Sequence, residues 1–547
     1  MNSTFKVVFN KARGALMVVN EATSSVQAKG TKTVVAAAVA TMMAGVACAD
    51  QSVANNAAYI TGDLAIENGK YTPTGVVTTD KEGNKTWGAT DTLKSGANIT
   101  FVGDKGSLTL NVKAPKEQDD GADITQELGA LKGTGVVNLN GFNGAKKDEV
   151  AYAAQVTVGS LATAAGDTEA SDITFKFASK NALVTGDNAN TAAENTLTVT
   201  DGVIGNEAVV TDKKVTMGAM AVTFDVAENT HATVVSDANL VLNKVAIKNA
   251  GVLTFDAAET KQIVQNAAID ATGMTGKLVF ADNATVNKSV TADSIFVGQM
   301  GADESATVNY AGTATLQGVL SETSDTGVIT PAQWTTFKGD KLTVASTLML
   351  NQFAAVDAKE MGVKAAGTFT TQAGSKVNVG TFTSLGASTL NGETTITTAN
   401  VNGGTTTFVG ETVIENLNVG NKDIKAAAVA TVSGDTTLGT VSVLGATSQN
   451  KAELTIGATN KEVNVTSATV GSFGTLTVAN GENHFASVAV NGVNADSKAA
   501  LAIQDGTNVF DALTVGEYGS LTVADGDNTF TDITLGKDVK PELPTGN

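Results

Sequence analysis

The chain has 547 residues, with 55 acidic and 36 basic side chains, a net charge of −19 and one cysteine. Arg13 is the only arginine, and no cluster of basic residues is apparent, so a nucleic-acid-binding face is not expected. Only 5% of residues are aromatic and five are proline, whereas 56 are glycine. Abundant Val, Thr, Ala and Asn favour a thin-walled β structure over a disordered chain.

Residues 1–49 have the pattern of an export signal. Val34–Val46 is a 13-residue apolar run that is too short to span a bilayer comfortably. Ala47, Cys48 and Ala49 then form a small-x-small cleavage pattern ahead of Asp50. We therefore expect cleavage between Ala49 and Asp50.

Two motifs near the start of this signal resemble those of a known family. Residues 5–10 (FKVVFN) and 17–21 (MVVNE) lie in a basic region that is unusually long for a signal peptide. They resemble the extended signal peptide region of large type V secreted proteins of Gram-negative bacteria, the autotransporters and their two-partner relatives. That family usually has tryptophan where this chain has Phe9 and Leu16, and often serine at Asn20. The resemblance implies engagement of the protein-export machinery and a passenger that folds as a β-helix after export.

Cys48 is expected to leave with the signal. A lipid-anchored cysteine needs a large aliphatic residue three positions upstream, and Gly45 occupies that position. Residues 1–49 hold five basic residues and one acidic residue, so the remainder has 31 basic and 54 acidic residues and a net charge of −23. Without cysteine, that remainder would have no disulfide and no thiol chemistry.

The rest of the chain can be divided into sections according to how regularly its apolar residues alternate. Short strand candidates are irregularly spaced at first, become regular, are interrupted once, and then repeat plainly to near the end. The expected divisions are an irregular β-solenoid section at 50–220, a β-solenoid at 221–319, a loop or insertion at 320–338, solenoid repeats at 339–536 and a tail at 537–547.

Within the repeats, residues 390–401 (LNGETTITTANV) and 408–419 (FVGETVIENLNV) are offset by 18 residues. Residues 475–490, 500–515 and 520–535 share a longer pattern, with starts 25 and then 20 residues apart. Each of these three copies is a strand, an Asn-Gly or Asp-Gly corner and a second strand. Such periods predict a parallel β-helix or related β-solenoid, since one unit cannot bury its apolar face alone.

The three long copies also predict columns along the solenoid. Asn483, Asn508 and Asn528 would either hydrogen-bond in a ladder or stabilise turns, and the sequence leaves both open. The rival topology is a chain of antiparallel hairpins closed by the same Asp-Gly turns. In the solenoid, two interior columns form the predicted repeat core, namely Leu476, Leu501 and Leu521, and Phe485, Phe510 and Phe530.

The segment after Leu535 departs from the autotransporter pattern. Residues 536–547 contain no series of alternating strands such as a membrane barrel would need. We therefore expect the chain to lack the C-terminal β-barrel translocator, either because it is a separated passenger or because another factor exports it. Retention in the periplasm is the alternative location.

Residue types that carry chemistry are sparse. His231 and His484 are far apart, and neither has a second ligand at a zinc spacing. The acidic pairs Asp119-Asp120 and Asp525/Asp527 could be a glycosidase carboxylate pair or a weak calcium site, but turn chemistry explains the second pair better. We predict no catalytic residue, no cofactor and no metal site.

These observations favour an exported, acidic, non-enzymatic β-solenoid that acts as a surface structural or adhesive protein. Its location would be the cell surface or the extracellular space, and its mature part would have no membrane-spanning segment. Its partners would be the export machinery and a glycan or protein ligand of a host, or further copies of itself. The alternatives are a self-assembling surface-layer or filament subunit, suggested by a repeat that ends without a cap, and a polysaccharide-acting β-helix enzyme.

Overall fold

The computed structural model describes two sets of residues. The first is the body of the chain, at 96–113, 121–146, 149–184, 189–258, 261–271, 275–281, 284–286, 288–292, 294–298, 331–537 and 539–543. The second is a set of short strands at 5–10, 15–20, 57–60, 63–67, 70–73, 77–79, 85–87, 313–316 and 319–320. No helix occurs in either set, so none there is long and apolar enough to cross a membrane.

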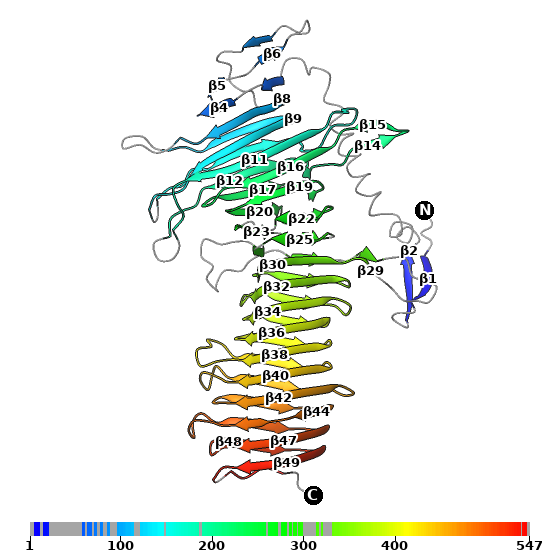
Figure 1. The fold of residues 1–547 in the computed structure, drawn as a ribbon, viewed down its shortest axis with the longest axis vertical. Helices are drawn as coiled ribbons and strands as arrows, with labels where there is room; N and C mark the ends of the chain where they lie inside the picture. Colours follow the sequence, from blue (N-terminus) through cyan, green and yellow to red (C-terminus); the bar gives the residue numbers. More distant parts are fainter. Residues whose placement is uncertain are drawn as a thin grey trace.

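The fold is a parallel β-helix, as the sequence predicts. Coils are stacked in chain order along one axis, from the cyan strands to the red ones (Figure 1). Leu476 pairs in parallel with Leu501, and Leu501 with Leu521. The rival topology of antiparallel hairpins is therefore excluded for the C-terminal repeats.

One side of the solenoid is a 14-stranded sheet, which we call the narrow sheet. Its strands are β13 (Val203–Ile204), β18 (Leu240–Leu242), β21 (Ile263–Gln265), β24 (Ala284–Val286), β27 (Thr313–Leu316), β31 (Thr347–Leu350), β33 (Thr368–Thr371), β35 (Ala387–Leu390), β37 (Gly404–Phe408), β39 (Ala428–Val432), β41 (Ala452–Ile456), β43 (Gly474–Val478), β46 (Ala499–Ile503) and β48 (Gly519–Val523).

The remaining strands of the coils form the wide sheet. They are β3 (Ala57–Ile60), β4 (Asp63–Glu67), β5 (Lys70–Pro73), β8 (Ala97–Asn111), β9 (Ile124–Phe142), β10 (Ala154–Val158), β11 (Ser171–Lys180), β12 (Glu194–Val199), β16 (Met220–Val226), β17 (His231–Ser236), β19 (Val245–Asn249), β20 (Val252–Ala257), β22 (Ile269–Ala271), β23 (Lys277–Phe280), β25 (Val290–Ala292), β26 (Ser294–Val297), β30 (Thr335–Val344), β32 (Ala354–Val363), β34 (Lys376–Ser384), β36 (Glu393–Val401), β38 (Thr412–Val419), β40 (Thr436–Val443), β42 (Glu462–Val470), β44 (Glu482–Phe485), β45 (Val488–Val490), β47 (Thr507–Val515) and β49 (Asp527–Leu535).

Separate antiparallel hairpins lie outside these two sheets. They are β1 (Phe5–Asn10) with β2 (Ala15–Asn20), β6 (Val77–Thr79) with β7 (Lys85–Trp87), β14 (Val209–Thr211) with β15 (Lys214–Met217), and β28 (Val319–Leu320) with β29 (Pro331–Gln333).

From β30 onward each coil has three flat sides. One side is a strand of the narrow sheet, and the other two are the halves of a wide-sheet strand that bends in the middle. In β36, residues 394–396 and 398–401 pair with β38, whereas Thr397 at the bend has no register partner. We call the outer surfaces of the two halves the first-half face and the second-half face, in chain order.

The interior is one continuous apolar cluster. It extends from Ile99 in β8 to Val523 in β48, and alternate residues of the strands point into it. Five phenylalanines in β11, β16, β20, β23 and β30 form a ring-to-ring column with centroid separations from 5.8 to 6.1 Å, namely Phe175, Phe224, Phe255, Phe280 and Phe337.

The coils upstream of residue 220 pair by the same rule but are built from longer strands. β8 has 15 residues and β9 has 19, and β9 pairs in parallel with β8, β10 and β11. Further along, β30 begins at Thr335, inside the range expected to be a loop or insertion, and pairs with β26 and β32. Residues 321–330 of that range lie outside the described residues.

The C-terminal tail lies against the last strand of the narrow sheet, so the expectation of an uncapped repeat is wrong for that sheet. The amide of Val523 donates to the carbonyl of Glu542 at 2.8 Å, and the amide of Glu542 donates to Leu521 at 2.9 Å. These two bonds cover the outer edge of β48. The outer edge of β49, in the wide sheet, has no partner strand among the described residues.

Candidate functional site

The predicted repeat core lies in the interior, so it stabilises the solenoid and is not available to a ligand. Leu476, Leu501, Phe485 and Phe510 are at most 1% exposed, Leu521 is 3% exposed, and Phe530 packs against the core from the last coil. The rings of Phe485 and Phe510 are stacked with centroids 4.9 Å apart, and those of Phe510 and Phe530 are 5.2 Å apart.

The asparagine column forms a hydrogen-bonded ladder. The side-chain amide of Asn483 donates to Oδ1 of Asn508 at 2.9 Å, and the amide of Asn508 donates to Oδ1 of Asn528 at 2.8 Å. The Asn508 amide also donates to the carbonyl of Asp505 at 3.0 Å, so the same side chain stabilises the corner. The asparagines therefore both form a ladder and stabilise turns, the two roles that the sequence leaves as alternatives.

Steric crowding explains why glycine occurs at these corners. Gly506 has φ of +95°, and a Cβ there would lie 2.6 Å from the carbonyl oxygen of Gly481 in the coil before. A side chain would meet both a left-handed backbone and a neighbouring coil. The Asn-Gly and Asp-Gly corners are therefore required by close coil stacking.

The outer surfaces of the downstream coils differ in charge. Acidic side chains gather at the start of the first-half face, where several coils each contribute one: Glu393, Glu411, Asp435, Glu462, Glu482 and Asp527. Lys461 donates to Asp435 at 2.8 Å, and this bond is the main reason that the pKa of Asp435 is lowered. The backbone amide of Glu462 lowers the pKa of Asp435 further.

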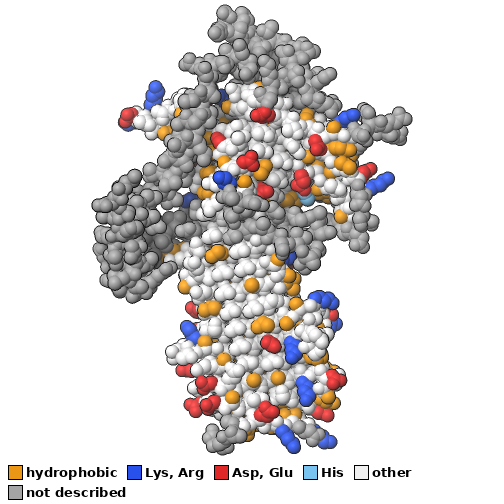
Figure 2. Space-filling model, turned by 180° about the vertical axis from the view of Figure 1, so that it is seen from behind, with side chains coloured by type: hydrophobic (Ala, Val, Ile, Leu, Met, Phe, Trp, Pro, Cys, Tyr) orange, Lys and Arg blue, Asp and Glu red, His pale blue; other side chains and the backbone are white. Residues whose placement is uncertain are grey.

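The other two faces of the same coils are rows of uncharged polar side chains. From β34 to β42 the outward residues of the second-half face are Thr381, Thr383, Thr398, Asn400, Asn416, Asn418, Thr440, Ser442, Ser467 and Thr469. The narrow sheet is similarly rich in outward threonine from β33 to β48, with Glu453 as a charged exception. The rear view of the solenoid is correspondingly pale over much of its lower part (Figure 2).

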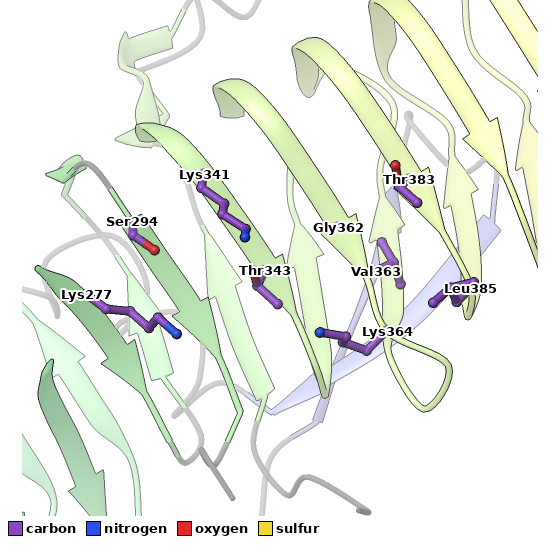
Figure 3. A pocket seen from close by; sticks show the side chains of 9 residues that line it. All are labelled: Lys277, Ser294, Lys341, Thr343, Gly362, Val363, Lys364, Thr383 and Leu385. Carbon is purple, nitrogen blue, oxygen red and sulfur yellow. The ribbon is translucent and has the colours of Figure 1, made fainter. Parts of the chain in front are cut away.

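Positive charge gathers where the second-half face begins, in a hollow between β23, β26, β30, β32 and β34 with a volume of about 180 Å³. We call it the lysine hollow. Nine residues line it: Lys277, Ser294, Lys341, Thr343, Gly362, Val363, Lys364, Thr383 and Leu385. Three are lysines and none is acidic. Figure 3 shows the three lysine side chains directed toward the space between them.

Strand register brings these lysines together. Lys277 is the register partner of Ser294, and Ser294 is the partner of Lys341 in the next coil. Lys364 follows the last residue of β32, so it approaches from the far side of the hollow. Lys277 and Lys341 are 64 residues apart in the chain, and Lys341 and Lys364 are 23 residues apart. Coil stacking, and not proximity in the sequence, therefore makes the cluster.

The lysines differ in their surroundings. The Lys277 ammonium lies 5.4 Å from the centre of the Phe296 ring, a cation–π contact. Lys341 and Lys364 form no ion pair with another described residue. Glu360 is the register neighbour of Lys341, but it does not line the hollow. Two of the lysines are therefore available to an external anion.

This cluster corrects the sequence analysis, which found no gathering of basic residues. The lysines come from coils on both sides of residues 320–338, where the repeat is interrupted in the sequence. The alternation of apolar and polar residues within each strand does predict that Lys277 and Lys341 point outward. Their shared position along the solenoid became visible only with the strand register.

The histidines and acidic pairs do not form a common site. His484 lies 3.0 Å from Asp511 on the first-half face, beside Glu462 and Glu482, and is half exposed. His231 lies 3.0 Å from Glu194, far from His484 in the stack of coils. No group of three or more metal-ligating side chains occurs in the part of the chain that the structure describes.

Of the two acidic pairs, the structure describes only Asp525 and Asp527. Asp525 accepts a hydrogen bond from the amide of Gly526 at 2.9 Å, as expected of a corner residue, and Asp527 begins β49. Asp119 and Asp120 lie outside the described residues.

One partly buried acidic side chain has a shifted pKa. Asp201 precedes β13, and its burial raises its pKa above the ordinary value of 3.8. Hydrogen bonds from the backbone amide of Val203, from the Ser160 hydroxyl and from its own amide lower that pKa and only partly offset burial. This carboxyl therefore affects the pH dependence of folding.

Comparison with protein families concerns the N-terminus. Residues 1–49 match the family described as the extended signal peptide of the type V secretion system. The chain is exported to the cell surface or the extracellular space. Of the matched residues the structure describes only β1 and β2, an antiparallel pair, so the predicted cleavage residues Ala47, Ala49 and Asp50 lie outside the described residues. A search of curated proteins finds no match.

The matched signal and the described fold agree with one another. A type V secretion signal is followed by a parallel β-helix that resembles an autotransporter passenger. The resemblance inferred from residues 5–10 and 17–21 is confirmed by the family match.

Proposed function

We propose that this protein is a non-enzymatic passenger that acts as a structural or adhesive element at the cell surface. The observation that carries the proposal is the joining of a type V secretion signal to one solenoid whose core runs without a break from Ile99 to Val523. A long rod with stacked coils presents many side chains of one kind in line. Such a surface suits contact with an extended partner.

The chemistry of the outer faces supports adhesion more than catalysis. Rows of threonine, asparagine and serine offer hydroxyl and amide groups that can hydrogen-bond a partner over several coils. The histidines His231 and His484 are each engaged by one carboxylate and lie in separate coils. We therefore assign no catalytic residue and no cofactor or metal.

Two other functions stay as alternatives. A self-assembling surface-layer or filament subunit would use the outer edge of β49, which has unpaired backbone groups among the described residues. A polysaccharide-acting enzyme would use a carboxylate pair, and Glu462 with Glu482 is the pair in register beside a hollow. No second observation favours either alternative.

Location and adhesion are tested together on producing cells. Intact cells are treated with protease, and the cells, periplasm and medium are blotted for the chain. We expect the chain to be cleaved at the surface or found in the medium, and purified chain on beads to bind host cells or their glycans. Chain that is protected in the periplasm would contradict the proposal, and depolymerisation of a glycan substrate would replace it with the enzyme.

A further inference from the structure

We propose that the lysine hollow binds a sulfate or carboxylate group of an acidic polysaccharide that lies along the second-half face. The inference names a ligand class for the adhesive function proposed above and rests on it. Its basis is the convergence of Lys277, Lys341 and Lys364 on one hollow in a strongly acidic chain.

The charge of the hollow is opposite to that of the molecule. The chain has a net charge of −19, yet the hollow is lined by three cationic side chains and no acidic one. Lys341 and Lys364 form no ion pair with a described residue, whereas elsewhere on the solenoid lysines commonly pair with carboxylates, as Lys359 does with Asp340 at 2.8 Å and Lys376 with Glu393 at 2.8 Å. Three converging ammonium groups repel one another, and a bound anion would relieve that repulsion.

The size and donors of the hollow fit a single anionic group. Its volume of about 180 Å³ is below the range of roughly 300–1,000 Å³ that is usual for pockets that enclose a drug-sized ligand. Ser294, Thr343 and Thr383 add hydroxyl donors beside the ammonium groups. Charge-assisted hydrogen bonds to sulfate or carboxylate oxygens are among the stronger polar contacts.

The surroundings of the hollow favour a polymer over a free anion. From Thr383 the same outward position continues through Asn400, Asn418 and Ser442 without a charged residue. The amide of Asn418 donates to Oδ1 of Asn400 at 2.9 Å, so this row is ordered before any ligand arrives. Neighbouring coils are about 4.8 Å apart, so the row offers hydrogen-bonding groups at close, regular intervals to the hydroxyls of a sugar chain.

The test compares charged and neutral polymers that share a backbone. The purified exported chain is immobilised, and dextran sulfate and unsulfated dextran of equal length are passed over it. We expect binding of dextran sulfate that weakens as salt rises, and little binding of dextran. Alginate, which carries only carboxylates, distinguishes carboxylate from sulfate as the preferred group, and binding of either polymer at the hollow supports the proposal.

Lysine variants locate the binding. Lys341→Gln and Lys364→Gln should each weaken dextran sulfate binding by about tenfold, the loss expected for one charge-assisted contact. Lys338→Gln is the matched control, since Lys338 lies on the same strand but pairs with Asp357 outside the hollow. Unchanged unfolding temperatures show that the variants fold.

Three results would overturn the proposal. They are no binding of either acidic polymer, an equal loss in Lys338→Gln, and full displacement of the polymer by anionic phospholipid vesicles, which would indicate a membrane ligand. Because purified chain is used, failure here would leave the surface location intact, and the shaving experiment would still test the proposed function separately.

Discussion

At the scale of single residues, the asparagine ladder shows how this solenoid tolerates polar groups inside. Asn483 and Asn508 are at most 2% exposed, and each donates along the axis to the next coil. A buried amide without partners would be costly, so the ladder depends on every member.

Removal of the central amide should therefore loosen the last coils. Asn508→Ala leaves the Asn483 amide without its acceptor, and a buried unsatisfied group costs about 1–3 kcal/mol. Hydrogen exchange of backbone amides in β44, β47 and β49 should become faster. The control is Asn464→Ala, which removes an outward amide from β42. Equal acceleration in both variants would contradict the ladder's role.

The phenylalanine stack gives a second residue-scale prediction. Phe510 is fully buried between Phe485 and Phe530, so Phe510→Ala should destabilise the C-terminal coils by about 3–5 kcal/mol. Val509→Ala, which changes the outward neighbour, should have a small effect. Protease resistance of the C-terminal fragment is the measurement, and resistance equal to that of the parent would refute an interior role for Phe510.

Asp201 predicts the direction of a pH effect. Since its pKa is raised on folding, the folded chain keeps this proton at pH values where the unfolded chain has lost it. Its contribution to stability therefore falls as pH rises from about 3.8 through the raised pKa. Asp201→Asn keeps the acceptor for the Val203 amide and removes the titration, so it should reduce this decline.

Asp435 is the control for that measurement because its shift has the opposite sign. Its pKa is lowered by Lys461, so its contribution is present at neutral pH and is lost as pH falls through the lowered pKa. Unfolding curves across the acidic range should separate Asp201→Asn from Asp435→Asn. If stability declined with rising pH as steeply in Asp201→Asn as in the parent chain, Asp201 would not be the group responsible.

At the scale of elements, sequence reasoning succeeds where coils have one short period. The 18-residue offset between residues 390–401 and 408–419 corresponds to the register of β36 with β38, which pairs residues 394–396 and 398–401 with the residues 18 positions later. Short strands with small corners leave that period intact in the sequence. Fold class and the interior columns of the last coils follow from it.

Sequence reasoning fails where loops between coils vary in length. The phenylalanine column from Phe175 to Phe337 passes through strands whose spacing in the chain changes at every step, so no repeat reveals it. The lysine hollow is hidden for the same reason. Residues on an outer face can be predicted one strand at a time, but which of them become neighbours depends on register.

The tail yields a prediction for one element. Two backbone hydrogen bonds join Glu542 to Leu521 and Val523, so they protect the outer edge of β48. Truncation after Val539 should accelerate hydrogen exchange at the Val523 amide, while the Leu501 amide in β46, one coil inward, should change little. Unchanged protection of Val523 would mean that the tail does not cover this edge in solution.

At the scale of the whole molecule, stability is a sum over neighbouring coils. Each coil contacts the one before and the one after, so unfolding is expected to proceed in segments and not as one two-state transition. Local exchange and local proteolysis are therefore better measures of the variants above than a single melting temperature.

The shared register of β36 and β38 has a consequence for the gene. Removal of residues 394–411 would join Glu393 to Thr412, and the new strand could occupy the place of the old one between β34 and β40. Recombination between such segments would shorten or lengthen the rod by whole coils without altering its ends. A chain altered in this way would differ in the reach of its rod while it keeps the same signal and the same fold.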